Sequence, residues 1–205
     1  MGEGVVGVIL AGGLARRMGG GDKALLPLAG RPLVAHIAER VRPQVARLVL
    51  NANGDAARFA GVAAPVVPDD VPNFPGPLAG ILAGMEWAAA EAPDCRWLAS
   101  FPGDAPLLPL DLVSRMRDAV ARQGAEMACA ASDGRTHPVI GLWPVALAGE
   151  LRRALVDEDI RKIDRWTARY RIVVVEWPAG ELDPFFNVNT PEDLARLEGM
   201  VSGHG

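Results

Sequence analysis

The stretch VILAGGLARRMGGGDKALLPLAGR, from Val8 to Arg31, determines the fold that this sequence predicts. An apolar run, Val5 to Leu10, stops abruptly at glycine, and the turn that follows carries Arg16, Arg17 and Lys23. Glycine lets backbone N–H groups approach a ligand because no Cβ intervenes, and the three cations supply charge that a polyphosphate would neutralise. A strand ending in such a loop places the loop at the carboxyl edge of a sheet, where open α/β folds bind ligands. The stretch therefore predicts a cradle for a nucleoside triphosphate.

A plain surface turn, a P-loop and a dinucleotide-binding loop fit this segment less well. A solvated turn seldom concentrates glycines and cations in this way, since most connections use about two to six residues. A P-loop requires Gly-Lys-Ser/Thr, whereas Asp22 precedes Lys23 and Ala24 follows it. The segment Gly2 to Gly7 matches G-x-G-x-x-G, but it lies before the first predicted strand, and the dinucleotide fingerprint lies after one.

Length and composition bound the class of protein. The chain has 205 residues, 50% of them hydrophobic, which suits a single α/β domain with a sizeable core. Its net charge is −4 and its sequence pI is about 5.4, so no overall basic field would attract nucleic acid or an anionic membrane. We therefore expect no nucleic acid and no membrane among its partners.

The signals for secretion and for a metal cluster are weak. No apolar run approaches the ~20 residues that a membrane helix needs. The N-terminal apolar segment follows no Lys or Arg and ends in glycines, unlike a secretory signal. Cys95 and Cys129 lack metal-ligand spacing, and two cysteines in a chain of this size suggest reduced thiols. We expect a cytoplasmic protein.

Strand-like and helix-like runs alternate along the chain, which predicts crossover units and a mostly parallel central sheet with helices on both faces. The predicted strands are 5–10, 47–50, 66–67, 97–101, 127–131, 139–143 and 172–177. The predicted helices begin at Pro32, after Pro77, near Pro109 and at Pro191, with further helix in 145–170. The helix after Pro77 is expected to bury Leu78, Leu82, Met85 and Ala89 on one stripe, and 132–137 is expected to be a polar loop.

Polar residues stand at the ends of the predicted strands. Residues 10–12, Asn51, Asp69 and Asp104 all lie at carboxyl ends of strands that we expect to be neighbours, so they would line one crevice. A carboxylate at Asp104, beside a triphosphate, would suit Mg²⁺, which takes one or two carboxylates together with phosphate oxygens. Asp104 could instead cap the next helix or occupy a simple turn, and Asp69 has ordinary turn chemistry.

Several motifs follow one another along the chain. They are L-A-G-G-x-x-x-R-M-G-x-x-D-K-x-L-x-x-L-x-G-R-P-L, N-A-N, P-G-P-L-A-G, G-D-x-P, H-P and N-V-N-T-P-E-D-L. From about Val6 to Arg196 this order resembles the molybdenum cofactor guanylyltransferases. The first motif fits many nucleotidyltransferases, whereas P-G-P-L-A-G together with N-V-N-T-P-E-D-L is more specific. The match is weakest between Pro144 and Asp183.

The resemblance implies a fold and an activity. It implies one Rossmann-like nucleotidyltransferase domain over 1–205, with a nucleotide-binding half of about 1–110 and a molybdopterin-binding half of about 111–200. It also implies transfer of GMP from GTP to the terminal phosphate of molybdopterin, with release of pyrophosphate and with Mg²⁺ as cofactor.

The resemblance also assigns roles to individual residues. Lys23 would contact the phosphates, Asn51 and Asp69 the guanine or ribose, and Asp104 would be the Mg²⁺ ligand. The other residues assigned to the nucleotide are Leu10, Ala11, Gly12, Gly13 and Pro77. Arg17, Lys23 and Asp104 would form the catalytic set, with the two cations neutralising the departing pyrophosphate.

On the pterin side, the resemblance places Asn187 and Asn189, with His137 nearby. The two asparagines could instead shape the loop before a helix capped by Thr190, and His137 could be a packed loop residue. These alternatives stay open at the level of the sequence.

Three other functions share part of the pattern. A CTP-dependent molybdopterin cytidylyltransferase carries a related loop, although Gly12-Gly13 resembles the guanine-using branch more closely. A sugar-phosphate nucleotidylyltransferase would share the cradle and Asp104 but not the match from Asn187 to Leu194. A non-catalytic GTP-binding protein need not keep Arg17, Lys23 and Asp104 together.

Partners beyond the substrates GTP and molybdopterin are hypotheses. Because the finished cofactor is labile, we expect handover to a molybdenum-insertion protein and to client molybdoenzymes, although no surface motif shows it. The sequence carries no signal for assembly, and we expect a monomer or a weak oligomer.

Overall fold

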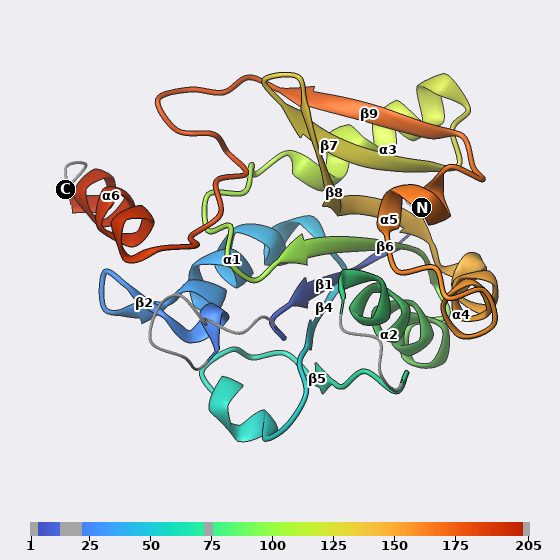
Figure 1. Ribbon diagram of the computed structural model, residues 1–205, viewed down its shortest axis with the longest axis horizontal. Helices are drawn as coiled ribbons and strands as arrows, with labels where there is room; N and C mark the ends of the chain where they lie inside the picture. The colour runs from blue at the N-terminus through green and yellow to red at the C-terminus, as the bar shows by residue number, and fades with distance from the viewer. Residues whose placement is uncertain (1–3, 13–21, 72–75, 203–205) are drawn as a thin grey trace.

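A computed structural model describes residues 4–12, 22–71 and 76–202 of the chain. Its centre is a seven-stranded sheet in the order β5-β4-β1-β6-β8-β7-β9 (Figure 1). The strands are β1 (Gly4–Leu10), β4 (Arg47–Asn51), β5 (Val66–Val67), β6 (Cys95–Pro102), β7 (Met127–Ser132), β8 (Arg135–Pro144) and β9 (Ile172–Trp177). All pairings are parallel except those of β8 with β6 and β7. The predicted mostly parallel α/β sheet is confirmed.

The sheet carries helices on both faces. The helices are α1 (Leu33–Val41), α2 (Pro77–Glu91), α3 (Leu112–Gln123), α4 (Ala148–Val156), α5 (Ile163–Thr167) and α6 (Pro191–Ser202). Successive residues of β1 point to opposite faces: Val5 and Ile9 pack with α1 and α3, whereas Val6 and Val8 pack with α2, α4 and α5. Figure 1 shows α1 and α3 on one side of the sheet and α2, α4 and α5 on the other. The chain is therefore a single domain with two apolar layers.

The reversed direction of β8 follows from the turn that precedes it. Asp133 and Gly134 alone connect Ser132 to Arg135, and both have positive φ, 49° and 72°. A two-residue turn with two positive φ values joins antiparallel strands, and Asp-Gly is a favoured pair for it, whereas parallel strands need a long crossover. The predicted loop over 132–137 is therefore wrong. It is a hairpin, and His137 lies on a strand.

Two predicted helices differ in detail from the structure. Ala89 is exposed and Ala88 is buried in its place, because α2 packs between the sheet and α4 and therefore buries more than one stripe. The helix expected near Pro109 begins at Leu112, and its N-cap is Asp111. Asp104 therefore does not cap it.

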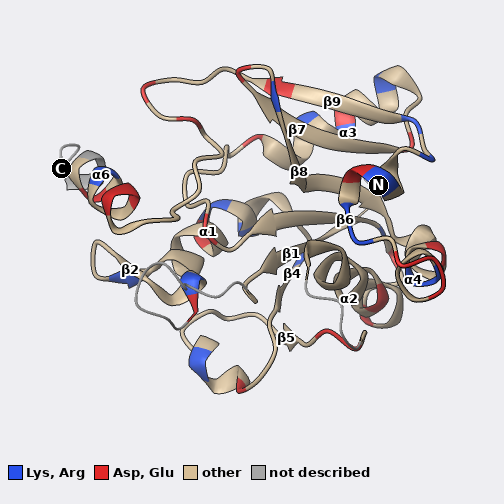
Figure 2. Ribbon diagram, in the orientation of Figure 1, with Lys and Arg blue, Asp and Glu red and all other residues tan. Residues whose placement is uncertain are grey.

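A small third cluster joins the C-terminal helix to the short hairpin β2 (Pro27–Leu28) and β3 (Arg31–Pro32). Its buried members are Leu28, Leu33, Val188 and Leu197. The helix α6 lies at one end of the molecule in Figure 1. Figure 2 shows acidic and basic residues interspersed over the helices. None of the described helices is long and apolar enough to cross a membrane.

Candidate active site

A cleft of about 600 Å³ opens at the carboxyl ends of β1, β4 and β6. The predicted site residues that line it are Leu10, Ala11, Gly12, Lys23, Asn51, Asp69, Pro77, Asp104 and Asn187. They come from segments far apart in the chain, and parallel pairing of the strands brings their ends to one edge. Gly13 and Arg17, which the sequence also predicts at this site, lie outside the described residues.

Lys23 and Asp104 meet in this cleft. The Lys23 Nζ lies 2.5 Å from Asp104 Oδ2 and also donates to Asn189 Oδ1 at 2.5 Å. The lysine and aspartate side chains are 15% and 21% exposed, so a ligand can still reach them. Asn189 itself does not line the cleft, and it acts on the site through the ammonium.

The turn that carries Asp104 is held by backbone hydrogen bonds. Gly103 N donates to Leu10 O at 3.0 Å, and Val188 N donates to Asp104 O at 2.9 Å. A Cβ on Gly103 would lie 2.7 Å from Leu10 O, so only glycine permits this approach without a backbone shift. The end of β6 is thereby tied both to β1 and to the segment before α6.

Asp69 is held by two asparagines on the far side of β1. Its Oδ1 accepts from Asn51 Nδ2 at 2.7 Å, and its Oδ2 accepts from Asn53 Nδ2 at 3.1 Å. Its backbone N–H donates to Asn53 Oδ1 at 2.8 Å. Asn51 is buried beneath α2, where a Cβ on Gly80 would lie 2.2 Å from Asn51 Oδ1. This network fixes one wall of the cleft.

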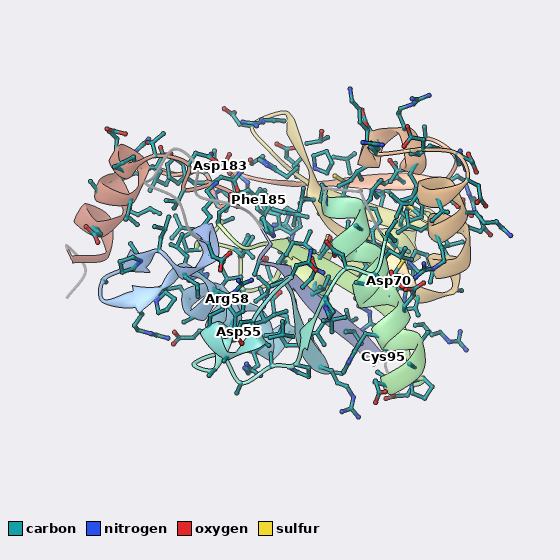
Figure 3. All side chains as sticks on the ribbon, turned by 60° about the horizontal axis from the view of Figure 1, so that its bottom comes forward. Asp55, Arg58, Asp70, Cys95, Asp183 and Phe185 are labelled. Atoms are coloured by element: carbon teal, nitrogen blue, oxygen red, sulfur yellow. The ribbon has the colours of Figure 1, made fainter. Side chains whose placement is uncertain are left out.

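Arg58 connects that wall to the glycine-rich stretch. Its Nε lies 2.9 Å from Asp22 Oδ2, and its Nη2 donates to Asn53 O. It belongs to a short 3-10 helix, η4 (Ala56–Phe59), whose start is capped by Asp55 Oδ1 accepting from Ala57 N at 2.9 Å; Figure 3 labels Asp55 and Arg58 there. Neither Arg58 nor Asn53 was predicted at the site, although the N-A-N motif contains Asn53.

The opposite wall is the start of β8. Residues 135–140 line the cleft, whereas β8 pairs with β6 only from Gly141 to Pro144. His137 is 9% exposed, and its ring packs against Phe185 with centroids 4.8 Å apart. Burial lowers the pKa of His137, and the nearby Asp183 carboxylate partly opposes this shift. His137 thus packs against Phe185 and also lines the cleft. The sequence had left open whether it is a packed residue or lies at the site, and it is both. Arg135 and Thr136 line the cleft without having been predicted there.

The segment before α6 is ordered by a reciprocal cap. Asp193 Oδ2 accepts from the backbone N–H groups of Asn189 and Thr190 at 2.8 and 2.9 Å, and Thr190 Oγ1 accepts from Asp193 N at 3.2 Å. Asn187 has a buried side-chain oxygen with no hydrogen-bond partner among the described residues. The asparagines therefore shape the loop and also face ligand space or the Lys23 ammonium.

The described residues contain no group of three or more His, Cys, Asp or Glu that would hold a metal ion by themselves. Asp104 supplies one carboxylate in the cleft, and only its Oδ2 contacts another described side chain. One carboxylate facing space for phosphate oxygens and water is the donor set that Mg²⁺ accepts. The residues present therefore fit a divalent cation that arrives with a polyphosphate.

Comparisons with known proteins agree with this geometry. The sequence matches the MobA-like NTP transferase domain over residues 7–175. The molybdenum cofactor guanylyltransferase of Rhodopseudomonas palustris strain BisB5 is 59% identical over 194 residues, which are 95% of this chain and 92% of that protein. The corresponding protein of Bradyrhizobium sp. strain ORS 278 is 57% identical over 198 residues, 97% of this chain and 93% of that protein.

A solved structure shares the fold as well. The crystal structure of molybdopterin-guanine dinucleotide biosynthesis protein A from Archaeoglobus fulgidus has a TM-score of 0.74 and 25% sequence identity, covering 97% of this chain and 99% of that one. The matched lengths include both walls of the cleft. The chain therefore belongs to the molybdenum cofactor guanylyltransferase family, with its MobA-like NTP transferase domain, and is a nucleotidyltransferase.

Proposed function

We propose that this protein transfers GMP from GTP to the terminal phosphate of molybdopterin and releases pyrophosphate. An oxygen of that phosphate attacks the α-phosphorus of GTP, and the bond from the α-phosphorus to the oxygen bridging to the β-phosphorus breaks. The observation that carries the proposal is the meeting of Lys23 and Asp104 between the two walls of one cleft. The names of the relatives support the choice of substrates.

The nucleotide would occupy the wall formed by β1, β4 and β5. Leu10, Ala11 and Gly12 line the cleft there, and Asn51 and Asp69, which are hydrogen-bonded to each other, would contact the base or ribose. The Lys23 ammonium would contact the phosphates. In this proposal Arg17 and Gly13 keep the roles that the sequence assigns to them.

The chemistry needs charge neutralisation more than a base. Two polyanions must approach within bonding distance, and phosphoryl transfer is catalysed mainly by positioning and electrostatic stabilisation. Lys23 would neutralise the departing pyrophosphate, and Asp104 would hold a Mg²⁺ ion. When bound, that ion supplies further positive charge to phosphate oxygens.

A covalent intermediate on serine is not supported by the geometry. Ser132, His137 and Asp183 are in contact, but the serine hydroxyl lies between the imidazole and the carboxylate, with its Oγ 2.7 Å from His137 Nε2 and 2.8 Å from Asp183 Oδ1. A nucleophilic triad places the histidine in the middle. The arrangement instead suits a structural or recognition role.

The test is a reconstituted reaction. Purified protein is incubated with GTP, Mg²⁺ and molybdopterin, and released pyrophosphate is measured, with CTP replacing GTP and a sugar 1-phosphate replacing molybdopterin in parallel. We expect release only with molybdopterin and preferentially with GTP. Preference for CTP would indicate a cytidylyltransferase, use of the sugar phosphate would indicate a sugar-phosphate nucleotidylyltransferase, and GTP binding without release would indicate a non-catalytic protein.

Some expectations from the sequence stay predictions. They concern the division into halves at about residue 110, the cytoplasmic location, the monomeric or weakly oligomeric state, and contacts with a molybdenum-insertion protein and client molybdoenzymes.

A further inference from the structure

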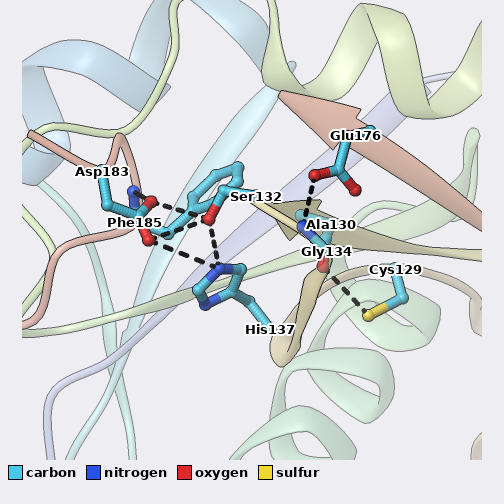
Figure 4. A network of polar contacts seen from close by, with 8 residues as sticks. All are labelled: Cys129, Ala130, Ser132, Gly134, His137, Glu176, Asp183 and Phe185. Atoms are coloured by element: carbon cyan, nitrogen blue, oxygen red, sulfur yellow. Dashed lines mark hydrogen bonds and ion pairs between the residues drawn. The ribbon is translucent and has the colours of Figure 1, made fainter. Parts of the chain in front are cut away.

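Three side chains around the hairpin β7–β8 form a hydrogen-bonded relay (Figure 4). Ser132 Oγ lies 2.7 Å from His137 Nε2, and 2.8 and 2.9 Å from the two carboxylate oxygens of Asp183. Ser132 is 1% exposed. Asp183 is fixed in turn, because its Oδ1 accepts from Phe185 N at 2.8 Å. No step of the proposed transfer uses this relay.

The relay determines where the proton of His137 resides. An ionised carboxylate only accepts hydrogen bonds, and a serine hydroxyl has one hydrogen to donate. Ser132 therefore donates to Asp183, and its oxygen is left to accept from His137 Nε2–H. A neutral imidazole with its hydrogen on Nε2 carries a lone pair on Nδ1. Burial, which lowers the pKa of His137, favours this neutral form.

The second ring nitrogen of His137 is the one left for a ligand. Nδ1 makes none of the hydrogen bonds found among the described residues, and in Figure 4 it points away from Ser132 and Asp183. The ring is held against Phe185, and His137 belongs to the lining of the cleft. Asn187 lines the same cleft with a side-chain oxygen that also lacks a partner in the described part of the chain.

Two acceptors without donors indicate what kind of group they would bind. The Asn187 oxygen is buried, and a buried acceptor left unpaired costs free energy, so a ligand that supplies N–H donors gains affinity and one that lacks them is rejected. A pterin carries an amino group and a ring N–H on one edge. Guanine carries a similar edge, but its proposed contacts, Asn51 and Asp69, lie on the opposite wall from β8. The pterin is therefore the ring that remains for the β8 wall.

We propose that His137 is a specificity-determining residue for the acceptor substrate, with its Nδ1 accepting a hydrogen bond from an N–H group of the pterin ring. Ser132 and Asp183 are positioning residues that hold the imidazole in the required tautomer. This inference rests on the proposed function, because it assigns the acceptor wall of the same cleft.

The tautomer is measured directly on the wild-type protein. The chain has three histidines, so ¹⁵N-histidine labelling gives a spectrum in which the His137 signals are identified by their loss in His137→Asn. We expect unprotonated Nδ1 and protonated Nε2 at neutral pH, and a shift of the Nδ1 signal when molybdopterin is added. A proton on Nδ1 at neutral pH, or an unchanged Nδ1 signal with bound molybdopterin, overturns the proposal.

Kinetics test the consequence for specificity. His137→Phe keeps the ring packing but removes the acceptor, whereas His137→Asn places an amide oxygen near the position of Nδ1. We expect His137→Phe to lower kcat/KM for molybdopterin at least tenfold, with kcat/KM for GTP changed less than twofold at saturating molybdopterin. His137→Asn should recover part of the loss and remain usable if the phenylalanine variant fails to fold.

The positioning role has its own control. Ser132→Ala should mix the two tautomers of His137 and raise KM for molybdopterin with little change in kcat. Ser114→Ala is the control, because it removes an exposed hydroxyl on α3 that donates to Asp111 O. It should change neither KM for molybdopterin nor kcat. Equal losses for both substrates in the His137 variants, or wild-type kinetics in His137→Phe, overturn the inference while GMP transfer by the wild type stands. Absence of GMP transfer by the wild type overturns the proposed function itself and the inference with it.

Discussion

Lys23 Nζ and Asp104 Oδ2 lie 2.5 Å apart although 81 positions separate the two residues in the chain. The contact joins the segment after β1 to the end of β6, and Asn189 adds a third segment through the same ammonium. In this structure the two charges pair with each other. In the proposed reaction, a nucleoside triphosphate with a divalent cation would give both groups other partners, phosphate for the lysine and metal for the carboxylate.

Replacing either partner should abolish most of the activity without unfolding the protein. Loss of one charge-assisted contact costs about 1.5–3 kcal/mol, so Lys23→Met and Asp104→Asn should each slow pyrophosphate release roughly ten- to a hundredfold. Lys162→Met is the matched control, because the chain's other lysine is exposed at the start of α5. Near-normal turnover in both site variants, with melting temperatures unchanged, would contradict the mechanism.

Loss of the Asp69 carboxylate should weaken nucleotide binding more than loss of the Asp70 carboxylate does. The two carboxylate oxygens of Asp69 accept hydrogen bonds from the amide groups of Asn51 and Asn53. In Asp69→Asn one of these oxygens becomes an NH₂ group, which would face another NH₂ group and cannot accept its hydrogen bond. We expect this change to raise KM for GTP roughly tenfold. Asp70→Asn is the control, since its carboxylate pairs with Arg152 instead. The measurement is KM for GTP of the two variants from steady-state kinetics. An equal change in KM for Asp69→Asn and Asp70→Asn would place the nucleotide elsewhere.

The substitution Gly80→Ala should displace residues that line the cleft, although Gly80 itself lies in α2. The added Cβ would meet Asn51 Oδ1 at 2.2 Å and Leu10 Cδ2 at 2.7 Å, so Asn51 must move. We expect Gly80→Ala to weaken GTP binding and to destabilise the fold by about 1–3 kcal/mol, the usual cost of overpacking. Gly149→Ala in α4 meets nothing within 4 Å and should stabilise by up to about 1 kcal/mol. Chemical denaturation and GTP titration of both variants test this, and a Gly80→Ala protein with wild-type affinity would refute it.

The Cys129 thiol should make stability depend on pH in alkaline solution. Burial raises its pKa to about 11 from an ordinary 9.0. Below pH 9 both states keep the proton, but between the two values only the unfolded chain releases it, so the free energy of unfolding falls as pH rises. Between pH 8 and pH 10 the wild type should therefore lose more stability than Cys129→Ala does. Parallel pH dependence in the two proteins would show that the thiol titrates normally when folded.

The sequence predicted one wall of the site better than the other. Leu10, Asn51, Asp69 and Asp104 follow apolar strands, and the rule that parallel strands end at one edge is enough to bring them together. The contacts of Gly80 with Asn51 and of Arg58 with Asp22 depend instead on how a helix or loop packs over the sheet, and no local pattern encodes that packing.

On the other wall, His137 and Asn187 were predicted, but Arg135, Thr136 and the strand that carries them were not, because the turn before β8 was misassigned. Asp133-Gly134 is a hairpin signal that short-range chemistry provides, yet the polar residues around it favoured a loop. The partner of Ser132 and His137 is Asp183, about fifty positions away and beyond β9. Such a contact emerges only once the order of strands β8, β7 and β9 is known.

The reversed strand β8 has a consequence for how the two walls of the cleft can change in evolution. The other neighbouring strands give the cleft their last residues and the loops that follow, which can lengthen or shorten freely. β8 gives its first residues: Arg135, Thr136 and His137 are paired with β7, whereas residues 138–140 lie in the irregularity of that pairing. The wall made by strand ends can thus be remodelled by insertions in the loops, whereas a one-residue insertion between Arg135 and His137 would shift the register of the hairpin and turn the following side chains to the other face.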